Sequence, residues 1–246
     1  LIDFSHAGDM KVFIDDAQID ALEERMRKHG YLDAMALQKT FSVLRANDMI
    51  WSFVVNNYML GREPFPFDIL YWNDDSTNLP AAFHAYYLSH MYLHNDLVKP
   101  NKLTIAGVKM DMSVIKTPLY FLSTREDHIA PWVATYAGAA MISRSNPQVR
   151  FTLAESGHVA GVVNPAGAKK YGHWTANVDT RRVGRALPER HQDWLDATTY
   201  HEGSWWPDWA KWTGARSGGR TAPPPMGSAK YPPTEPAPGS YVKKKT

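Results

Sequence analysis

The sequence predicts an α/β fold, because two strand-like runs are separated by a helix. Residues 117–123 (Thr-Pro-Leu-Tyr-Phe-Leu-Ser) and 149–154 (Val-Arg-Phe-Thr-Leu-Ala) have the aromatic and β-branched content of buried strands. Between them we expect a helix from Trp132 to about Ser145, with Pro131 in its first turn, where a missing N–H is tolerated. Strand, helix, strand is typical of α/β sheets with parallel strands.

Residues 1–14 are predicted to belong to the core of this sheet. They contain two short β-like pieces, residues 1–4 and 11–14, separated by a turn-forming Ala-Gly-Asp at 7–9. We interpret the two pieces as a core strand and its continuation.

Residues 15–94 are predicted to form a mainly helical cap, inserted between strand-bearing regions, together with the helix that returns to the sheet. Asp15-Asp16 offers an N-cap to a first helix, which ends at a His-Gly pair. A second helix and an amphipathic apolar segment follow. Residues 75–78 then cap the return helix, which we expect from Leu79 through Asn95. A helical insertion of this kind covers an active site.

Residues 95–213 are expected to complete the sheet, with a returning strand at 102–105. Residues 214–246 are expected to form an extended tail, because they hold seven of the 17 prolines.

The composition argues against several classes of function. A formal net charge of +2, with no basic stripe, disfavours nucleic acid or an anionic membrane as the main partner. No apolar run approaches the length of a membrane span. His90 and His94 share a helix face, but no carboxylate follows at zinc spacing, so no metal site is predicted. No signal peptide is visible, and we expect a cytoplasmic protein.

An Asp and a His follow the two predicted strands, each at the carboxyl end. Asp127 comes four residues after the first strand-like run, and His158 comes four residues after the second. Open α/β sheets bind their ligands at this edge, and Asp before His is the chain order of the acid and base in an α/β-hydrolase. In such a site the carboxylate fixes the tautomer of the imidazole, which takes a proton from the nucleophile. The sequence therefore predicts the C-terminal portion of an α/β-hydrolase sheet.

These residues also have structural interpretations. Asp127 could form only a loop salt bridge with Arg125. For His158 this is the weaker interpretation, because Gly157 permits a tight approach that a surface loop does not require. The Trp205-Trp206 pair is interpreted as core or dimer packing, with the lining of an acyl channel as the alternative.

The nucleophile of such a triad is missing, since the chain contains no Cys and no Gly-x-Ser-x-Gly motif. We expect the nucleophile to lie upstream of Leu1, and this polypeptide alone to be inactive.

Five segments resemble the C-terminal part of class I polyhydroxyalkanoate synthases. They are residues 71–80, 125–132, 156–165, 203–209 and 235–243, so that the resemblance covers nearly the whole chain. It implies an acyltransferase that polymerises (R)-3-hydroxyacyl-CoA, releases CoA and holds the growing polyester as a thioester. No cofactor is implied, because acyl-CoA is a substrate.

The same resemblance implies roles for individual residues. His158 matches the general base that activates an upstream Cys. Asp127 matches its acidic partner, which is also proposed in the family to help activate the 3-hydroxyl group of the substrate. Asn95, His128 and Trp72 are then candidate substrate-binding residues. The implied assembly is a homodimer at the surface of a cytoplasmic storage granule, in contact with granule-associated proteins.

Two other interpretations remain open. A serine esterase or polyester depolymerase of the same fold would carry Ser in place of Cys, so the identity of the nucleophile separates it from a synthase. A non-catalytic subunit that dimerises with active copies has no reason to retain both Asp127 and His158.

Overall fold

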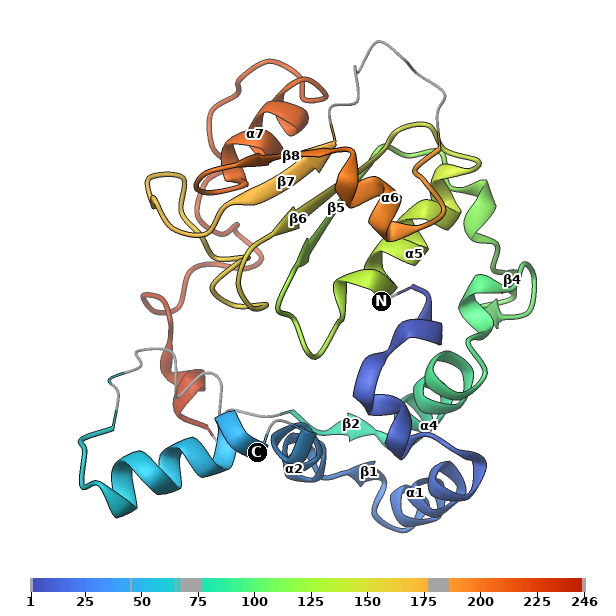
Figure 1. Ribbon diagram of the computed structural model, residues 1–246, viewed down its shortest axis with the longest axis vertical. Helices are drawn as coiled ribbons and strands as arrows, with labels where there is room; N and C mark the ends of the chain where they lie inside the picture. The colour runs from blue at the N-terminus through green and yellow to red at the C-terminus, as the bar shows by residue number, and fades with distance from the viewer. Residues whose placement is uncertain (1, 45, 65, 67–76, 177–185, 245–246) are drawn as a thin grey trace.

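The computed structural model describes residues 2–44, 46–64, 66, 77–176 and 186–244 (Figure 1). Within these ranges the fold is a mixed α/β structure, with a sheet, the helices that cover it, and a separate helical region. Trp72 lies outside the described residues.

The main sheet has four strands in the order β5-β6-β7-β8. Strands β5 (Leu119–Thr124) and β6 (Val149–Ala154) are parallel neighbours, with Phe121 opposite Phe151. Strands β7 (His173–Ala176) and β8 (Thr198–His201) extend the sheet in antiparallel pairing. The strands predicted at residues 117–123 and 149–154 are confirmed.

Helices cover both faces of the sheet, as the alternation of side chains along β6 shows. Phe151 and Leu153 face the core cluster formed with helices α5 (Trp132–Ser143) and α6 (His191–Asp196). Arg150 and Thr152, the intervening positions, form polar contacts on the side where α7 (Trp206–Gly214) lies. Because neighbouring strand residues point to opposite faces, α5 and α6 lie on one side of the sheet and α7 on the other (Figure 1).

A second core lies among the helices before the sheet. Helix α1 (Asp16–His29) packs on α4 (Ala81–Tyr87) and its π-helical continuation η5 (Leu88–Leu93). The buried side chains at its centre are Ile19, Met26, Leu32 and Leu88. The predicted ends of α1 are confirmed, since Asp15 accepts a hydrogen bond from the Gln18 N–H (2.8 Å) and Gly30 takes a left-handed conformation with φ 82°.

Two short strands and a long helical segment complete this region. Strand β1 (Tyr31–Leu32) pairs antiparallel with β2 (Leu79–Pro80). Helix α2 (Ala34–Leu44) is followed by the π-helical segments η3 (Asn47–Trp51) and η4 (Val54–Met59). In Figure 1 this segment projects away from the sheet. None of the described helices is both long enough and apolar enough to cross a bilayer.

The prediction of strands in residues 1–14 is wrong. Leu1 lies outside the described residues, and the chain after it forms two 3₁₀ helices, η1 (Phe4–His6) and η2 (Gly8–Phe13). The Phe4 N–H donates to the side chain of Asn95 (2.9 Å) instead of to a neighbouring strand. The Phe4 ring packs edge-on against Tyr87 and Tyr92, so that burial at this position comes from helical aromatic residues.

The return helix begins later than predicted, with Pro80 as its N-cap residue. Asn78 instead accepts a hydrogen bond from the Ala34 N–H (2.9 Å), at the start of α2. Asp75 and Ser76, two of the four predicted cap residues, lie outside the described residues.

The strand predicted at residues 102–105 does not join the main sheet. Strand β3 (Thr104–Ile105) pairs with β4 (Val108–Lys109) in a small hairpin. Short 3₁₀ helices, η6 (Asp96–Val98) and η7 (Met112–Val114), flank this hairpin. Beyond α7 the described chain is mostly exposed, and it forms one 3₁₀ helix, η8 (Ser240–Lys243).

Candidate active site

Two loops leave the sheet side by side, one after β5 and one after β6. Because the strands are parallel neighbours, their carboxyl ends meet at one edge. Backbone hydrogen bonds join the loops beyond the sheet, from Arg125 N to Ala154 O (2.8 Å) and from Glu126 N to Ser156 O (3.1 Å). The segments that carry Asp127 and His158 are therefore held together by the backbone itself.

The Asp127 carboxylate is fixed by its own loop. Its Oδ1 atom accepts hydrogen bonds from the N–H groups of Ile129 and Ala130, both at 2.9 Å. The side chain is 11% exposed. Asp127 is thus held in one orientation before any substrate is present.

His158 faces this carboxylate. Its Nδ1 atom lies 3.5 Å from Asp127 Oδ1, which is ion-pair range, but the two atoms form no hydrogen bond, and Nδ1 forms none with any other described residue. The imidazole is 39% exposed, so it is accessible on its other side. Catalytic hydrogen bonds are often long in ligand-free sites and tighten with substrate. With Nδ1 turned to the carboxylate, Nε2 remains as the proton acceptor.

The structural interpretation of Asp127 as a salt-bridge partner of Arg125 is not supported. These two residues form no ion pair, although both are described. The Arg125 guanidinium lies over the ring of Trp174, 5.1 Å from its centroid. The Asp127 carboxylate therefore has His158 as its ionisable neighbour.

His128 lies beside the pair. Its ring centroid is 5.5 Å from that of His158, with an angle of 59° between the rings. A polar side chain so close to the candidate base is suitably placed for substrate contact, which remains a prediction.

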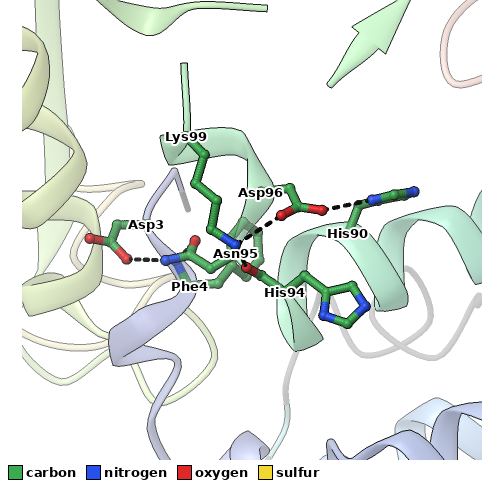
Figure 2. Close-up of polar contacts among 7 residues, drawn as sticks. All are labelled: Asp3, Phe4, His90, His94, Asn95, Asp96 and Lys99. Atoms are coloured by element: carbon green, nitrogen blue, oxygen red, sulfur yellow. Dashed lines mark hydrogen bonds and ion pairs between the residues drawn. The ribbon is translucent and has the colours of Figure 1, made fainter. Parts of the chain in front are cut away.

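Asn95 occupies a different environment, in the helical region (Figure 2). Its Nδ2 donates to Asp3 Oδ1 and its Oδ1 accepts from the Phe4 N–H, each at 2.9 Å. Its backbone is left-handed, with φ 50°. Both ends of the amide are thus engaged within the protein. Asn95 also lines a cavity of about 450 Å³, with Phe4, Ser5, Lys11, Ile14, Tyr92 and Leu93. Its predicted contact with substrate remains a prediction.

Asp96, next to Asn95, is buried and doubly paired. It accepts from Lys99 Nζ (3.0 Å) and contacts His90 Nδ1 (2.9 Å), while being 2% exposed (Figure 2). Burial by itself raises the pKa of Asp96, but the hydrogen bonds from His90 and Lys99 outweigh it and hold the pKa below its usual value. His90 therefore has a structural contact with Asp96. Within the described ranges no three metal-ligating side chains gather at one point.

Comparison with known proteins places these loops in a family. The chain is 44% identical to the poly(3-hydroxyalkanoate) polymerase subunit PhaC of Cupriavidus necator, over 100% of this chain and 41% of the relative. It is 46% identical to the poly(3-hydroxyalkanoate) polymerase of Methylorubrum extorquens, over 99% of this chain and 38% of the relative. The chain belongs to the poly(3-hydroxyalkanoate) polymerase family. It spans about two fifths of the length of these curated relatives. No protein-family model matches it.

In this member of the polymerase family, the crowded glycine of the His158 loop is Gly161, which the sequence did not single out. Gly157, which was expected to permit a close approach, has no described atom within 4 Å of the position that a Cβ would occupy. A Cβ at Gly161 would overlap the carbonyl oxygen of Glu155 and would lie 2.7 Å from Cγ2 of Thr124. The repeated glycine in Gly-His-Val-Ala-Gly was the available signal, because only a turn brings residue 161 back onto 157.

Glu155 is a second residue that the sequence did not single out. Its carboxylate accepts a hydrogen bond from the Gly172 N–H (2.6 Å), while its own N–H donates to Gly172 O (2.9 Å). These bonds tie the start of the His158 loop to the chain that enters β7.

Proposed function

We propose that the complete protein is an acyltransferase that polymerises (R)-3-hydroxyacyl-CoA into polyhydroxyalkanoate with release of CoA. The observation that carries this proposal is the Asp127–His158 pair, on adjoining loops at the carboxyl ends of two parallel strands. The names of the relatives, poly(3-hydroxyalkanoate) polymerases, support the reaction class and the polymer. The chain has no Cys, so the proposed nucleophilic Cys belongs to the part of the protein outside it.

The proposed chemistry follows from the placement of the pair. His158 Nε2 takes the proton from the Cys thiol, and the thiolate attacks the thioester carbonyl carbon of acyl-CoA. CoA leaves as the C–S bond breaks, and it receives the proton from the imidazolium. The 3-hydroxyl group of another chain end then gives its proton to His158 Nε2, and its oxygen attacks the carbonyl carbon of the enzyme thioester. The ester C–O bond forms as the C–S bond to the Cys breaks, and the released Cys takes up the proton from the imidazolium. Asp127 stabilises the imidazolium in both half-reactions and holds its orientation. No cofactor takes part, because acyl-CoA brings its own activated acyl group.

We further propose that residues 15–94 act as a cap and as a dimer contact. Support comes from the large apolar side chains that the segment after α2 leaves exposed, which include Trp51, Phe53, Tyr58, Met59 and Leu60. A cap also suits the reaction, because the thioester must react with an alcohol, and a cap would exclude the water that competes with this alcohol. The proposed location is the surface of polymer granules in the cytoplasm, among granule-associated proteins.

The test is CoA release from (R)-3-hydroxybutyryl-CoA by the complete protein, compared with its His158→Ala variant. The proposal expects polymer formation by the wild type and a loss of at least about 10³-fold in the variant, because removal of a triad member abolishes nucleophile activation. A wild type that hydrolyses polyester and makes none would point to the depolymerase. A wild type without either activity would point to the non-catalytic subunit.

A further inference from the structure

The loop that carries His158 is a short helical turn. Its hydrogen bonds run from Gly161 N to Gly157 O and from Val163 N to Val159 O, both at 2.8 Å. The turn does not continue into a helix, so the carbonyl groups at its end have no helical partners. The direction of the His158 side chain depends on this turn, because His158 is its second residue.

Two tryptophan side chains satisfy those carbonyl groups. The indole N–H of Trp205 donates to Gly161 O (3.1 Å) and Val162 O (3.2 Å). The indole N–H of Trp206 donates to Val162 O (3.0 Å). Trp205 and Trp206, which lie more than forty positions after the turn in the sequence, thus cap its carbonyl groups.

The segment that holds the indoles is itself attached to the same loop. Ser204 Oγ donates to Asn164 O and accepts from the Trp206 N–H (3.1 Å). Ser204 is buried. Ser204 therefore connects the segment that carries the two indoles to Asn164, which lies just after the turn.

Helix α7 fixes the position of Trp205 and Trp206 relative to the sheet. Asp208, in its first turn, accepts from Arg150 Nε (3.0 Å) and from the Tyr120 hydroxyl (2.9 Å). Arg150 belongs to β6, the strand that leads into the His158 loop, and Tyr120 belongs to β5, which leads into the Asp127 loop. Helix α7 is thus hydrogen-bonded to both strands that lead into the candidate site.

We propose that Trp205 and Trp206 are positioning residues for His158, which act through the indole N–H groups that cap its turn. This inference rests on the proposed function, since positioning matters only if His158 is a base. It replaces the expectation of simple core or dimer packing with a specific requirement for two N–H donors. A small displacement of the turn moves the imidazole relative to Asp127. The distance from His158 Nδ1 to Asp127 Oδ1 is already 3.5 Å.

The test removes the donors and keeps an aromatic ring at each position, with Trp205→Phe/Trp206→Phe in the complete protein. The matched control is Trp209→Phe, in the same helix with a half-exposed ring. We expect kcat for CoA release to fall about 10-fold to 100-fold with KM changed less than twofold, because misplaced catalytic groups slow the chemical step. The pH dependence of kcat/KM should shift in the double variant. The control should match the wild type in both.

A second readout does not depend on activity. Amide hydrogen exchange at residues 161–163 should accelerate in the double variant, and the imidazole NMR signals of His158 should move, while both stay unchanged in Trp209→Phe. Unchanged His158 signals and an unchanged pH profile would overturn the inference, even if thermal stability fell. If the wild type shows no polymerase activity, the proposed function fails, and the exchange and NMR data still decide whether the indoles order the turn. Single variants, which keep one donor each, serve if the double variant does not fold.

Discussion

Oδ1 of Asp127 lies 3.5 Å from Nδ1 of His158 while it accepts two backbone hydrogen bonds from its own loop. The Asp127 carboxylate is thus already fixed by its own loop, and closure of its contact with His158 requires only a small movement of the His158 turn. That turn is held by indole contacts from outside the sheet.

Replacement of Asp127 by Asn should keep the loop and remove the charge. The amide oxygen can still accept from Ile129 and Ala130, but it cannot stabilise an imidazolium. We expect kcat for CoA release by the complete protein to fall by about 10²-fold to 10⁴-fold. Asp193→Asn is the control, since the Asp193 contact with Arg190, at 3.8 Å, is exposed. A variant within twofold of the wild type would contradict the role assigned to Asp127.

Replacement of Gly161 by Ala should strain the His158 turn. The added methyl group would overlap Glu155 O and would lie 2.7 Å from Thr124 Cγ2, and both neighbours belong to the edge of the sheet. We expect a loss of about 1–3 kcal/mol in the free energy of unfolding, measured by urea denaturation. Gly157→Ala has open space around the new Cβ and should change stability by less than about 0.5 kcal/mol. If the loss of unfolding free energy for Gly161→Ala is as small as that for Gly157→Ala, the crowding at Gly161 is relieved at little cost, which contradicts this prediction.

Much of the site was predictable from short stretches of sequence. The order of strand, Asp, strand, His is local, and the parallel pairing of successive strands then brings Asp127 and His158 together without further information. The capping of α1 by Asp15 and Gly30 was predictable for the same reason, since each signal lies within a few residues of the helix end.

What could not be predicted depends on contacts between distant residues. Phe4 looks like part of a strand until Asn95, which is 91 positions away, takes its N–H. The indoles of Trp205 and Trp206 looked like packing residues, because their partners are carbonyl groups 43 or 44 positions earlier. In each case a backbone group is satisfied by a distant side chain, and neither hydrophobic periodicity nor turn chemistry encodes such a bond.

Replacement of Arg150 by Lys should loosen α7. Arg150 contacts Asp208 with two nitrogen atoms, at 3.0 and 2.5 Å, and the pair is about one fifth exposed. A lysine cannot reproduce this two-pronged contact. We expect a loss of about 1–3 kcal/mol in unfolding free energy. Arg144→Lys, in an exposed pair with Glu189, should cost less than about 1 kcal/mol. A smaller loss for Arg150→Lys than for Arg144→Lys would be inconsistent with this anchoring role.

Asp96 should make stability depend on pH in the acid range. Its pKa is lowered in the folded protein by His90 and Lys99, against the effect of burial. A depressed carboxyl pKa stabilises the fold above the unfolded value of about 4, and this contribution is lost as pH falls through the folded value. Asp96→Asn should therefore flatten the dependence of the urea midpoint on pH below about pH 4. Asp9→Asn, at an exposed position, should leave the dependence as in the wild type. Parallel curves for wild type and Asp96→Asn would refute the assignment.

Replacement of Asn95 by Ala tests whether this residue supports the fold or contacts substrate. The change removes two hydrogen bonds, to Asp3 and from Phe4, and places Ala in a left-handed conformation. A structural role predicts a loss of about 1–3 kcal/mol in unfolding free energy with KM and kcat near the wild-type values in the folded protein. Contact with substrate predicts a rise in KM or a fall in kcat that the stability change does not account for. Asn101→Ala, also at positive φ (61°), controls for backbone strain alone. Asn95 connects η1 to the end of η5, so a purely structural outcome would make it the residue that links the first residues of the chain to the return helix. Asn95→Ala should then speed hydrogen exchange at the Phe4 amide, and Asn101→Ala should not.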